Sequence, residues 1–250
     1  MSSAFKRVIH SSLEKLGYRL VRIEGQPGAG DSLSLFFSFL KAKGFNPLHV
    51  VDVGANRGNW TRTALKFFPD ARYTLVEPQD FLKKHVQDLI QSGHPIRWLN
   101  AGAGDASAKL TFTLADRDDS STFVLSEEEA KKAGFRQITV EVKTLNEIIR
   151  SEGLAADMVK IDAEGLDMRV LAGASELFGT TEIFLVEVNI HDTHKENTLE
   201  PVLKFMSEKG YHLLEITDLN RSPKDGLLWL CELAFLRNDS KLLDSVTAYE

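Results

Sequence analysis

The sequence predicts an α/β fold in which a mostly parallel sheet of seven strands carries helices on both faces. Short, β-branched apolar segments alternate with amphipathic segments from residue 45 onward, which is the pattern of a doubly wound sheet. The first apolar segment, residues 48–53, leads into a glycine turn and then directly into a helical segment, residues 60–68. Most of the predicted strands also end on polar residues, at the edge where open α/β sheets bind their ligands.

The elements of the first half follow that pattern in order. Residues 48–53 form an apolar run typical of a parallel strand that is covered on both faces. Pro78 ends the second strand because it lacks a backbone N–H donor. The predicted elements are helix 32–44, strand 48–53, helix 60–68, strand 73–77, helix 81–91 and strand 96–101.

An insertion then interrupts the alternation. Residues 110–115 and 137–142 alternate polar and apolar side chains and flank a polar segment, which predicts a small antiparallel pair bearing an insertion. The α/β pattern returns afterwards and completes the seven strands. These later elements are helix 144–151, strand 157–162, helix 166–177, strand 183–189, helix 199–209, strand 212–217 and strand 230–236.

Length and composition predict an ordinary globular protein. The 250 residues, 43% hydrophobic and 26% charged, are enough for one full core. We expect two parts: an N-terminal helical extension, residues 1–44, packed on the core, and the main domain, residues 45–250. The glycine- and proline-rich stretch 25–31 is a flexible joint within the extension.

Charge and cysteine content narrow the classes of partner. A net charge of −6 and a pI near 5.7 argue against a broad surface for nucleic-acid binding, because such a surface is usually basic. No apolar stretch approaches the length of a membrane span, and the N-terminus lacks the pattern of a secretory signal, so we expect no membrane association. The single cysteine, Cys231, allows no intrachain disulfide and fits a reducing compartment, so a cytoplasmic location is expected.

The glycine turn after the first strand predicts a ligand site. Gly54 and Gly58 have no Cβ and allow a ligand to approach backbone N–H groups at the start of a helix. Asn56 tolerates the left-handed backbone that such a turn requires. The spacing G-x-N-x-G differs from the G-x-G-x-x-G fingerprint of dinucleotide enzymes and favours S-adenosylmethionine over NAD. The second strand ends at Glu77, about 20 residues after the turn, where such folds place a carboxylate that binds ribose hydroxyls.

Five motifs in order resemble the FkbM family of S-adenosylmethionine-dependent methyltransferases. They are VDVGANRGNWT, LVEP, NAGAGD (100–105), VKTLNEI (142–148) and MVKIDAEGLDMRVLAGA (158–174). The resemblance covers about residues 48–189, and its most specific part is KIDAEG followed by VLAGA. It implies a class I methyltransferase (Rossmann-like) fold and, usually, O-methylation of a sugar or secondary-metabolite hydroxyl. It does not identify the acceptor.

The resemblance and the strand ends together suggest a cofactor site. The turn would take the methionine end of S-adenosylmethionine, Glu77 the ribose, and the NAGAGD segment the adenine, with Asp105 beside its amino group. Asp52 is equally suited to holding the turn through backbone N–H groups. The residues expected to bind the cofactor are Asp52, Gly54, Ala55, Asn56, Gly58, Glu77, Pro78, Asn100, Ala101, Asp105 and Asp162.

Methyl transfer also needs an acceptor oxygen that loses its proton. Asp162, at the end of a predicted strand, and His191, just past the next one, are the candidate bases. Surface exposure in a polar loop is the alternative for His191. The oxygens of Asp162, Glu164, Glu187 and Asn189 could bind Mg²⁺ or Ca²⁺, but the resemblance does not require a metal and none is predicted.

The sequence leaves the methyl acceptor and the oligomeric state undetermined. The polar residues 118–122 of the insertion could shape an acceptor pocket, or form an ordinary polar loop. We expect a small-molecule or glycan acceptor, no nucleic acid and an undetermined oligomeric state, with a homodimer possible through the N-terminal segment. The alternatives are an NAD-dependent oxidoreductase, against which the shorter glycine turn counts, and a non-catalytic cofactor-binding protein.

Overall fold

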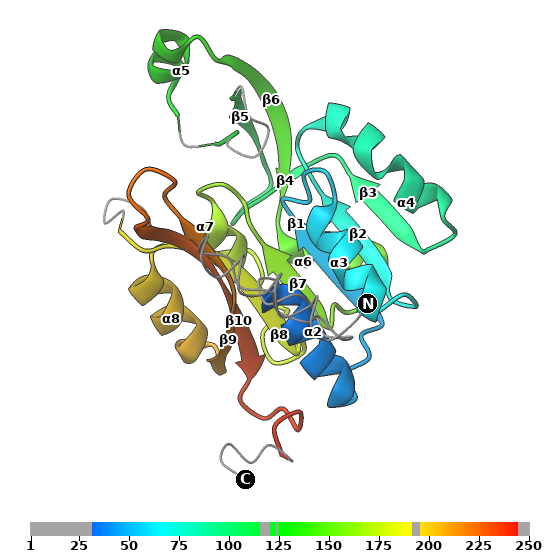
Figure 1. The fold of residues 1–250 in the computed structure, drawn as a ribbon. Helices are drawn as coiled ribbons and strands as arrows, with labels where there is room; N and C mark the ends of the chain where they lie inside the picture. The colour runs from blue at the N-terminus through cyan, green and yellow to red at the C-terminus, as the bar shows by residue number, and fades with distance from the viewer. Residues whose placement is uncertain (1–31, 116–120, 124, 192–195, 245–250) are drawn as a thin grey trace, which may run out of the picture. The chain divides into compact units, whose positions relative to one another are not determined.

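Seven strands form one sheet in the order β3-β2-β1-β7-β8-β10-β9 (Figure 1). The computed structural model describes residues 32–115, 121–123, 125–191 and 196–244, all within one compact unit, Ser32–Glu250. The strands are β1 (His49–Val53), β2 (Arg72–Val76), β3 (Ile96–Leu99), β7 (Met158–Ile161), β8 (Ile183–Asn189), β9 (Tyr211–Arg221) and β10 (Leu228–Arg237).

The pairing of these strands is that of a class I methyltransferase sheet. β1 pairs parallel with β2 and with β7, β2 with β3, and β7 with β8. β10 runs antiparallel between β8 and β9. Strand order reverses between β1 and β7, and ligands bind at such a switch point, beyond the carboxyl ends of the strands. The predicted fold class is confirmed.

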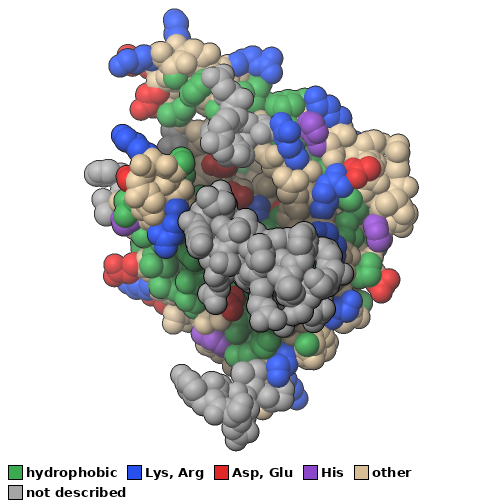
Figure 2. All heavy atoms as spheres, in the orientation of Figure 1, with side chains coloured by type: hydrophobic (Ala, Val, Ile, Leu, Met, Phe, Trp, Pro, Cys, Tyr) green, Lys and Arg blue, Asp and Glu red, His purple; other side chains and the backbone are tan. Residues whose placement is uncertain are grey.

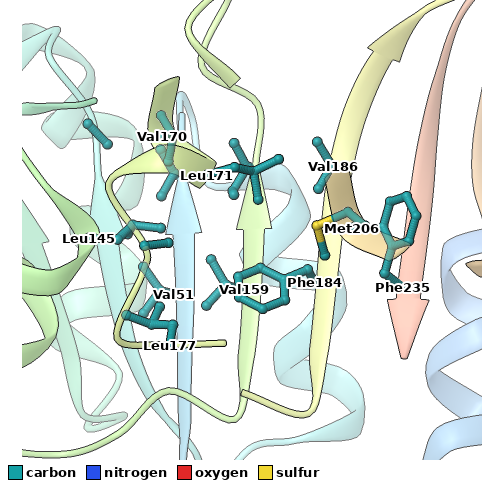
Figure 3. Packing of buried hydrophobic residues seen from close by; sticks show 14 of the residues in the cluster. Val51, Leu145, Val159, Val170, Leu171, Leu177, Phe184, Val186, Met206 and Phe235 are labelled. Atoms are coloured by element: carbon teal, nitrogen blue, oxygen red, sulfur yellow. The ribbon is translucent and has the colours of Figure 1, made fainter. Parts of the chain in front are cut away.

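Helices cover both faces of the sheet because its central strands, β1, β2, β7 and β8, are almost entirely buried on both sides. On one face Val51, Val159 and Phe184 pack against Leu145 and Met206 from the covering helices (Figure 3). On the other, a second cluster joins residues of the sheet to apolar side chains of α2 and α3. The helices are α2 (Ser32–Ala42), α3 (Asn59–Phe67), α4 (Gln87–Gln91), α6 (Leu145–Glu152), α7 (Asp167–Ala172) and α8 (Leu199–Glu208), with a 3-10 helix η1 (Asp80–Val86) before α4.

The insertion forms a second, small sheet. β5 (Ala108–Leu114) and β6 (Arg136–Lys143) pair antiparallel, as predicted, and β4 (Gly102–Ala103) joins the other edge of β6 in parallel. Helix α5 (Glu127–Ala133) lies between β5 and β6 in the chain and begins with a capping box of Ser126 and Glu129. Figure 1 shows the insertion extending from one end of the main sheet.

Some boundaries differ from the prediction. The helix predicted over 81–91 is divided into η1 and α4, and β9 extends to Arg221 rather than ending near residue 217. α2 belongs to the described unit, whereas residues 1–31 lie outside the described residues, so the predicted division at residue 44 stays a prediction. Among the helices described, none combines the length and apolar character that a membrane span requires.

Candidate functional site

The glycine turn adopts a backbone that only a few residue types accept. Gly54, Asn56 and Gly58 have φ angles of 73°, 47° and 75°, all in the left-handed region. A Cβ on Gly54 would lie 1.8 Å from the carbonyl oxygen of Asp162. The close approach of β1 to the end of β7 therefore requires glycine on both steric and conformational grounds.

Glu77 fastens the turn to the end of β2. Its side chain is only 3% exposed, and its two carboxylate oxygens accept hydrogen bonds from the backbone N–H groups of Asn56 and Gln79, each at 2.9 Å. Burial raises the pKa of Glu77, and these hydrogen bonds oppose the rise. A carboxylate has about four lone-pair sites, so two bonds leave acceptor capacity for a ligand.

A cavity with about 530 Å³ of empty space lies at the switch point of the sheet. The ends of β1, β2 and β7 form its walls, together with the segment after β3 and part of the insertion. Figure 2 shows a recess below the insertion, with acidic side chains visible inside it. The cavity is lined by Val53, Gly54, Asn56, Val76, Glu77, Pro78, Gln79, Ala101, Gly102, Ala103, Phe112, Ser121, Phe123, Asp162, Ala163 and Glu164.

Six of the sequence-predicted site residues border this cavity, and six do not. The structure brings together Gly54, Asn56, Glu77, Pro78, Ala101 and Asp162. Outside the lining lie Asp52, Ala55, Gly58, Asn100, Asp105 and His191. Several of these outer residues support the cavity from behind.

Asp52 is fully buried beneath the turn. It accepts a 2.6 Å hydrogen bond from the hydroxyl of Thr61 on α3, and its Oδ1 lies 3.6 Å from Nζ of Lys160. Among the described residues, Oδ1 has no hydrogen-bond partner. Burial raises the pKa of Asp52, and Lys160 opposes the rise. Within the described ranges, no backbone N–H of the turn donates to Asp52, so both of its predicted roles, holding the turn through backbone N–H groups and contacting the ligand, stay predictions.

Gly58 and Asn100 also act as supports. A Cβ on Gly58 would lie 2.6 Å from Cγ1 of Val86, so the start of α3 packs closely on η1. The side-chain amide of Asn100 donates to the carbonyl oxygens of Glu77 and Pro78 at 3.2 and 3.0 Å. These contacts hold the end of β2 in place.

Asp105 and His191 lie away from the cavity. Asp105 forms a 2.7 Å ion pair with Arg169, which holds the pKa of the carboxyl below its usual range. His191 is exposed and borders a different groove, beside residues 221–228 at the hairpin of β9 and β10. A contact of Asp105 with adenine and a catalytic role for His191 stay predictions.

Lys160 is a site residue that sequence reasoning missed. It is 5% exposed, and its Nζ donates to Oδ2 of Asp162 at 3.0 Å and to the carbonyl oxygen of Gly54 at 3.3 Å. Burial alone would lower the pKa of Lys160, but the nearby charges of Asp162 and Asp52 raise it overall. A single cation within the apolar run MVKI, on a strand buried on both faces, is the signal that could have identified it.

The insertion closes one side of the cavity with residues of the predicted pocket segment and with two aromatic residues, Phe112 and Phe123, that sequence reasoning missed. Ser121 donates from its hydroxyl to the side-chain oxygen of Gln79 at 3.3 Å, and Thr122 donates to the carbonyl oxygen of Glu164 at 2.7 Å. The rings of Phe112 and Phe123 have centroids 4.5 Å apart. Residues 121 and 122 of the predicted pocket segment thus connect two walls of the cavity, while residues 118–120 lie outside the described residues.

Several acids gather near the ends of β7, β8 and β10. Burial is the main reason that the pKa of Glu187 rises to about 10 and that of Glu232 to about 7. Asp167, at the start of α7, accepts hydrogen bonds from the backbone N–H groups of Ala163 and Gly165 and fixes the turn after β7. Within the described parts of the chain, no group of three or more His, Cys, Asp or Glu side chains is arranged to hold a metal ion.

One family model matches more than half of the chain. The family model of the methyltransferase FkbM domain matches residues 52–213. No curated protein sequence matches the chain.

Solved methyltransferases are similar to the chain at low identity. The O-methyltransferase of tomaymycin synthesis from Streptomyces achromogenes, in complex with S-adenosylmethionine, has 12% identity and a TM-score of 0.48, covering 95% of this chain and 91% of that one. The precorrin-6y C5,15-methyltransferase from Geobacter metallireducens has 11% identity and a TM-score of 0.47, covering 87% and 92%.

Proposed function

This chain belongs to the FkbM family of S-adenosylmethionine-dependent methyltransferases, and on that premise we propose that it methylates a hydroxyl oxygen of a sugar, glycan or secondary metabolite. S-adenosylmethionine is the cofactor and supplies the methyl group as an electrophilic carbon on a sulfonium. The chain's own residues then have three tasks: to bind the cofactor, to align the acceptor oxygen with the methyl carbon, and to accept the acceptor's proton.

The main support for the proposed cofactor site is the position of Glu77. Its carboxylate borders the cavity, is nearly inaccessible to solvent elsewhere, and is fixed by two backbone N–H groups. A fixed carboxylate with spare lone pairs can accept hydrogen bonds from both ribose hydroxyls. Gly54, where no Cβ fits, allows the methionine end to approach the backbone. The cavity's chemistry therefore fits the cofactor.

The adenine would lie at the other end of the cavity. Ala101, Gly102 and Ala103 present small side chains there, and Phe112 and Phe123 present aromatic rings. Adenine is a flat, apolar-faced ring that stacks on such side chains. This arrangement favours the adenine on the insertion side of the cavity and the methionine on the side of Gly54 and Asp162.

Asp162 and His191 remain the candidates for the proton acceptor. Asp162 borders the cavity with a side chain that is 29% exposed, so it can reach either the acceptor or the cofactor. Replacing each residue separates these roles. Loss of a base lowers kcat while the affinity for S-adenosylhomocysteine is kept, whereas loss of a cofactor contact lowers that affinity.

Calorimetric titration with S-adenosylhomocysteine and, in parallel, with NAD tests the cofactor first. We expect micromolar binding of the former, about −8 kcal/mol, and none of NAD. Hydroxylated sugars and metabolites would then be screened for uptake of a labelled methyl group. Binding of NAD alone would favour an oxidoreductase, and tight cofactor binding without any methylated product would favour a non-catalytic binding protein.

Location and assembly are part of the same proposal. We infer a cytoplasmic enzyme, because the single cysteine of the chain allows no intrachain disulfide and fits a reducing compartment. Homodimer formation through the N-terminal segment is tested by comparing the mass in solution of the full chain with that of a chain shortened by residues 1–31.

A further inference from the structure

Strand β7 places a buried cation directly behind the cavity. The Nζ of Lys160 donates to Oδ2 of Asp162 on one wall and to the carbonyl oxygen of Gly54 on the other, at 3.0 and 3.3 Å. It also lies 3.6 Å from Oδ1 of Asp52, beneath the turn. With its side chain only 6% exposed, Lys160 joins the glycine turn to the end of β7 from inside the protein.

Asp162 borders the cavity, and only one of its carboxylate oxygens is bound to Lys160. Oδ2 is bound to Lys160, whereas Oδ1 accepts no hydrogen bond from any residue within the described ranges. The backbone around Asp162 is fixed as well, since its N–H donates to the carbonyl oxygen of Val53 at 3.1 Å and its own carbonyl lies against Gly54. Asp162 therefore offers one carboxylate oxygen at a defined place.

We propose that Lys160 is a positioning residue that holds Asp162 as an ionised acceptor for the ammonium group of the cofactor's methionine moiety. This rests on the proposed function, in which Glu77 takes the ribose and Phe123 the adenine, so that the methionine lies at the Gly54 and Asp162 end. An ammonium is a charged donor and a carboxylate is its complementary acceptor. Lys160 itself lies behind Asp162 and acts through it.

The charges around Asp162 explain why the cation matters. The negative charge of Asp162 acts on acids of several elements: Asp52 on β1, Asp167 on α7, Glu187 on β8 and Glu232 on β10. Glu164, in the turn after β7, borders the same cavity. Lys160 is the cation that faces this group from the described elements. Without Lys160, no cation would offset the repulsion among these acids or hold the carboxylate of Asp162 in its orientation.

Calorimetry of the full chain with two ligands tests the proposal. S-adenosylhomocysteine carries the ammonium, whereas 5′-methylthioadenosine has the same nucleoside without the amino-acid group. For Lys160→Met we expect the affinity for S-adenosylhomocysteine near pH 7.5 to fall about tenfold or more, the effect of one charged hydrogen bond. The affinity for methylthioadenosine should change less than about twofold, since it makes no such bond.

The contrast between the two ligands is a readout that a merely structural role would not produce. If Lys160 served only to keep the protein folded, Lys160→Met would weaken the binding of S-adenosylhomocysteine and of methylthioadenosine alike.

Two variants keep the test decisive if Lys160→Met folds poorly. Asp162→Asn leaves the ion pair of Lys160 and Asp52 in place, and should show the same selective loss of S-adenosylhomocysteine affinity. Lys204→Met, on the exposed side of α8, is the matched control and should change neither affinity.

The outcomes separate this proposal from the proposed function. If S-adenosylhomocysteine binds the unchanged protein and Asp162→Asn leaves its affinity intact, the role of Lys160 is overturned and the cofactor assignment stands. An equal loss for both ligands in Asp162→Asn would also overturn it, because the contact would then not be to the methionine. If the unchanged protein binds neither ligand, the proposed function fails and this proposal with it.

Discussion

The side chain of Glu77 and the backbone N–H of Asn56 form a 2.9 Å hydrogen bond that joins the end of β2 to the glycine turn after β1. Asn56 is held there in a left-handed conformation, with φ of 47°. A single carboxylate therefore shapes the turn and, in the proposed function, also receives the ribose. The two roles make Glu77 the most informative position for mutation.

We expect Glu77→Ala to weaken binding of S-adenosylhomocysteine by about 1.5–3 kcal/mol, the effect of losing a charged acceptor. Calorimetry measures the change. Glu208→Ala, at the exposed end of α8, is the control and should bind normally. Unchanged binding in Glu77→Ala would remove this carboxylate from the cofactor site.

Gly54→Ala should distort the turn more than the same change at another left-handed glycine. Its Cβ would meet the carbonyl oxygen of Asp162 at 1.8 Å, whereas a Cβ on Gly93, with φ of 89°, meets nothing within 4 Å. Gly93→Ala should therefore cost only the conformational strain, about 1–2 kcal/mol. Thermal unfolding and ligand binding should both be impaired more in Gly54→Ala, and equal effects in the two variants would contradict the close approach of β1 and β7.

Phe123→Ala should weaken binding of S-adenosylhomocysteine and of methylthioadenosine alike, because both carry adenine. Loss of one aromatic contact corresponds to about 1 kcal/mol, or roughly fivefold in affinity. Phe81→Ala removes a ring that is 49% exposed and lies outside the cavity lining, and should have no effect. Normal binding by Phe123→Ala would move the adenine away from the insertion.

Glu232 should make the folded protein less stable as the pH rises. Burial raises the pKa of this carboxyl to about 7 in the folded state, from an ordinary value of 4.5. The folded state therefore holds a proton that the unfolded state has already lost. Protonated Glu232 therefore contributes stability that is fully present below about pH 4.5 and is lost as the pH rises through 7. The free energy of unfolding should fall by on the order of 2–3 kcal/mol over this range.

Glu232→Gln should abolish that dependence, since the amide is neutral at every pH and can keep the contact to Thr217. Denaturant unfolding at about pH 5 and about pH 8 measures the pH dependence of the free energy of unfolding. An ordinary carboxyl is already ionised at both values. Glu215→Gln makes the same charge change at an exposed position on β9 and should leave the dependence unchanged. An identical pH dependence in Glu232→Gln and the unchanged protein would show that this group is not responsible.

Much of the fold was predictable because its signals are local. The runs around Val51 and Phe184 are apolar on both faces of their strands, and this marks strands covered by helices on each side. The pairing of β5 and β6 followed from two-residue alternation. The division of the predicted helix 81–91 into η1 and α4 did not follow, since both parts have helical spacing in the sequence.

The cavity residues were predictable only in part, for a similar reason. Gly54 and Glu77 could be identified from their distance along the chain to the first strand. Ser121 lies in the polar segment proposed to shape a pocket, whereas Phe112 and Phe123 could not be identified, because apolar residues of an insertion show no relation in the sequence to the cavity that they line. Asp105 and His191 have suitable side chains, yet the structure pairs one with Arg169 and leaves the other exposed.

By itself, the sequence determined the order of the elements, the glycine turn and the family, since each depends on residue types at short separations. The tertiary structure alone decided that Lys160 lies between Asp52 and Asp162, because these three residues come from two strands more than a hundred residues apart in the chain that become neighbours only when β1 pairs with β7. Periodicity places Lys160 on a buried strand. Only the pairing of β1 with β7 shows that the carboxylates of Asp52 and Asp162 compensate the charge of Lys160.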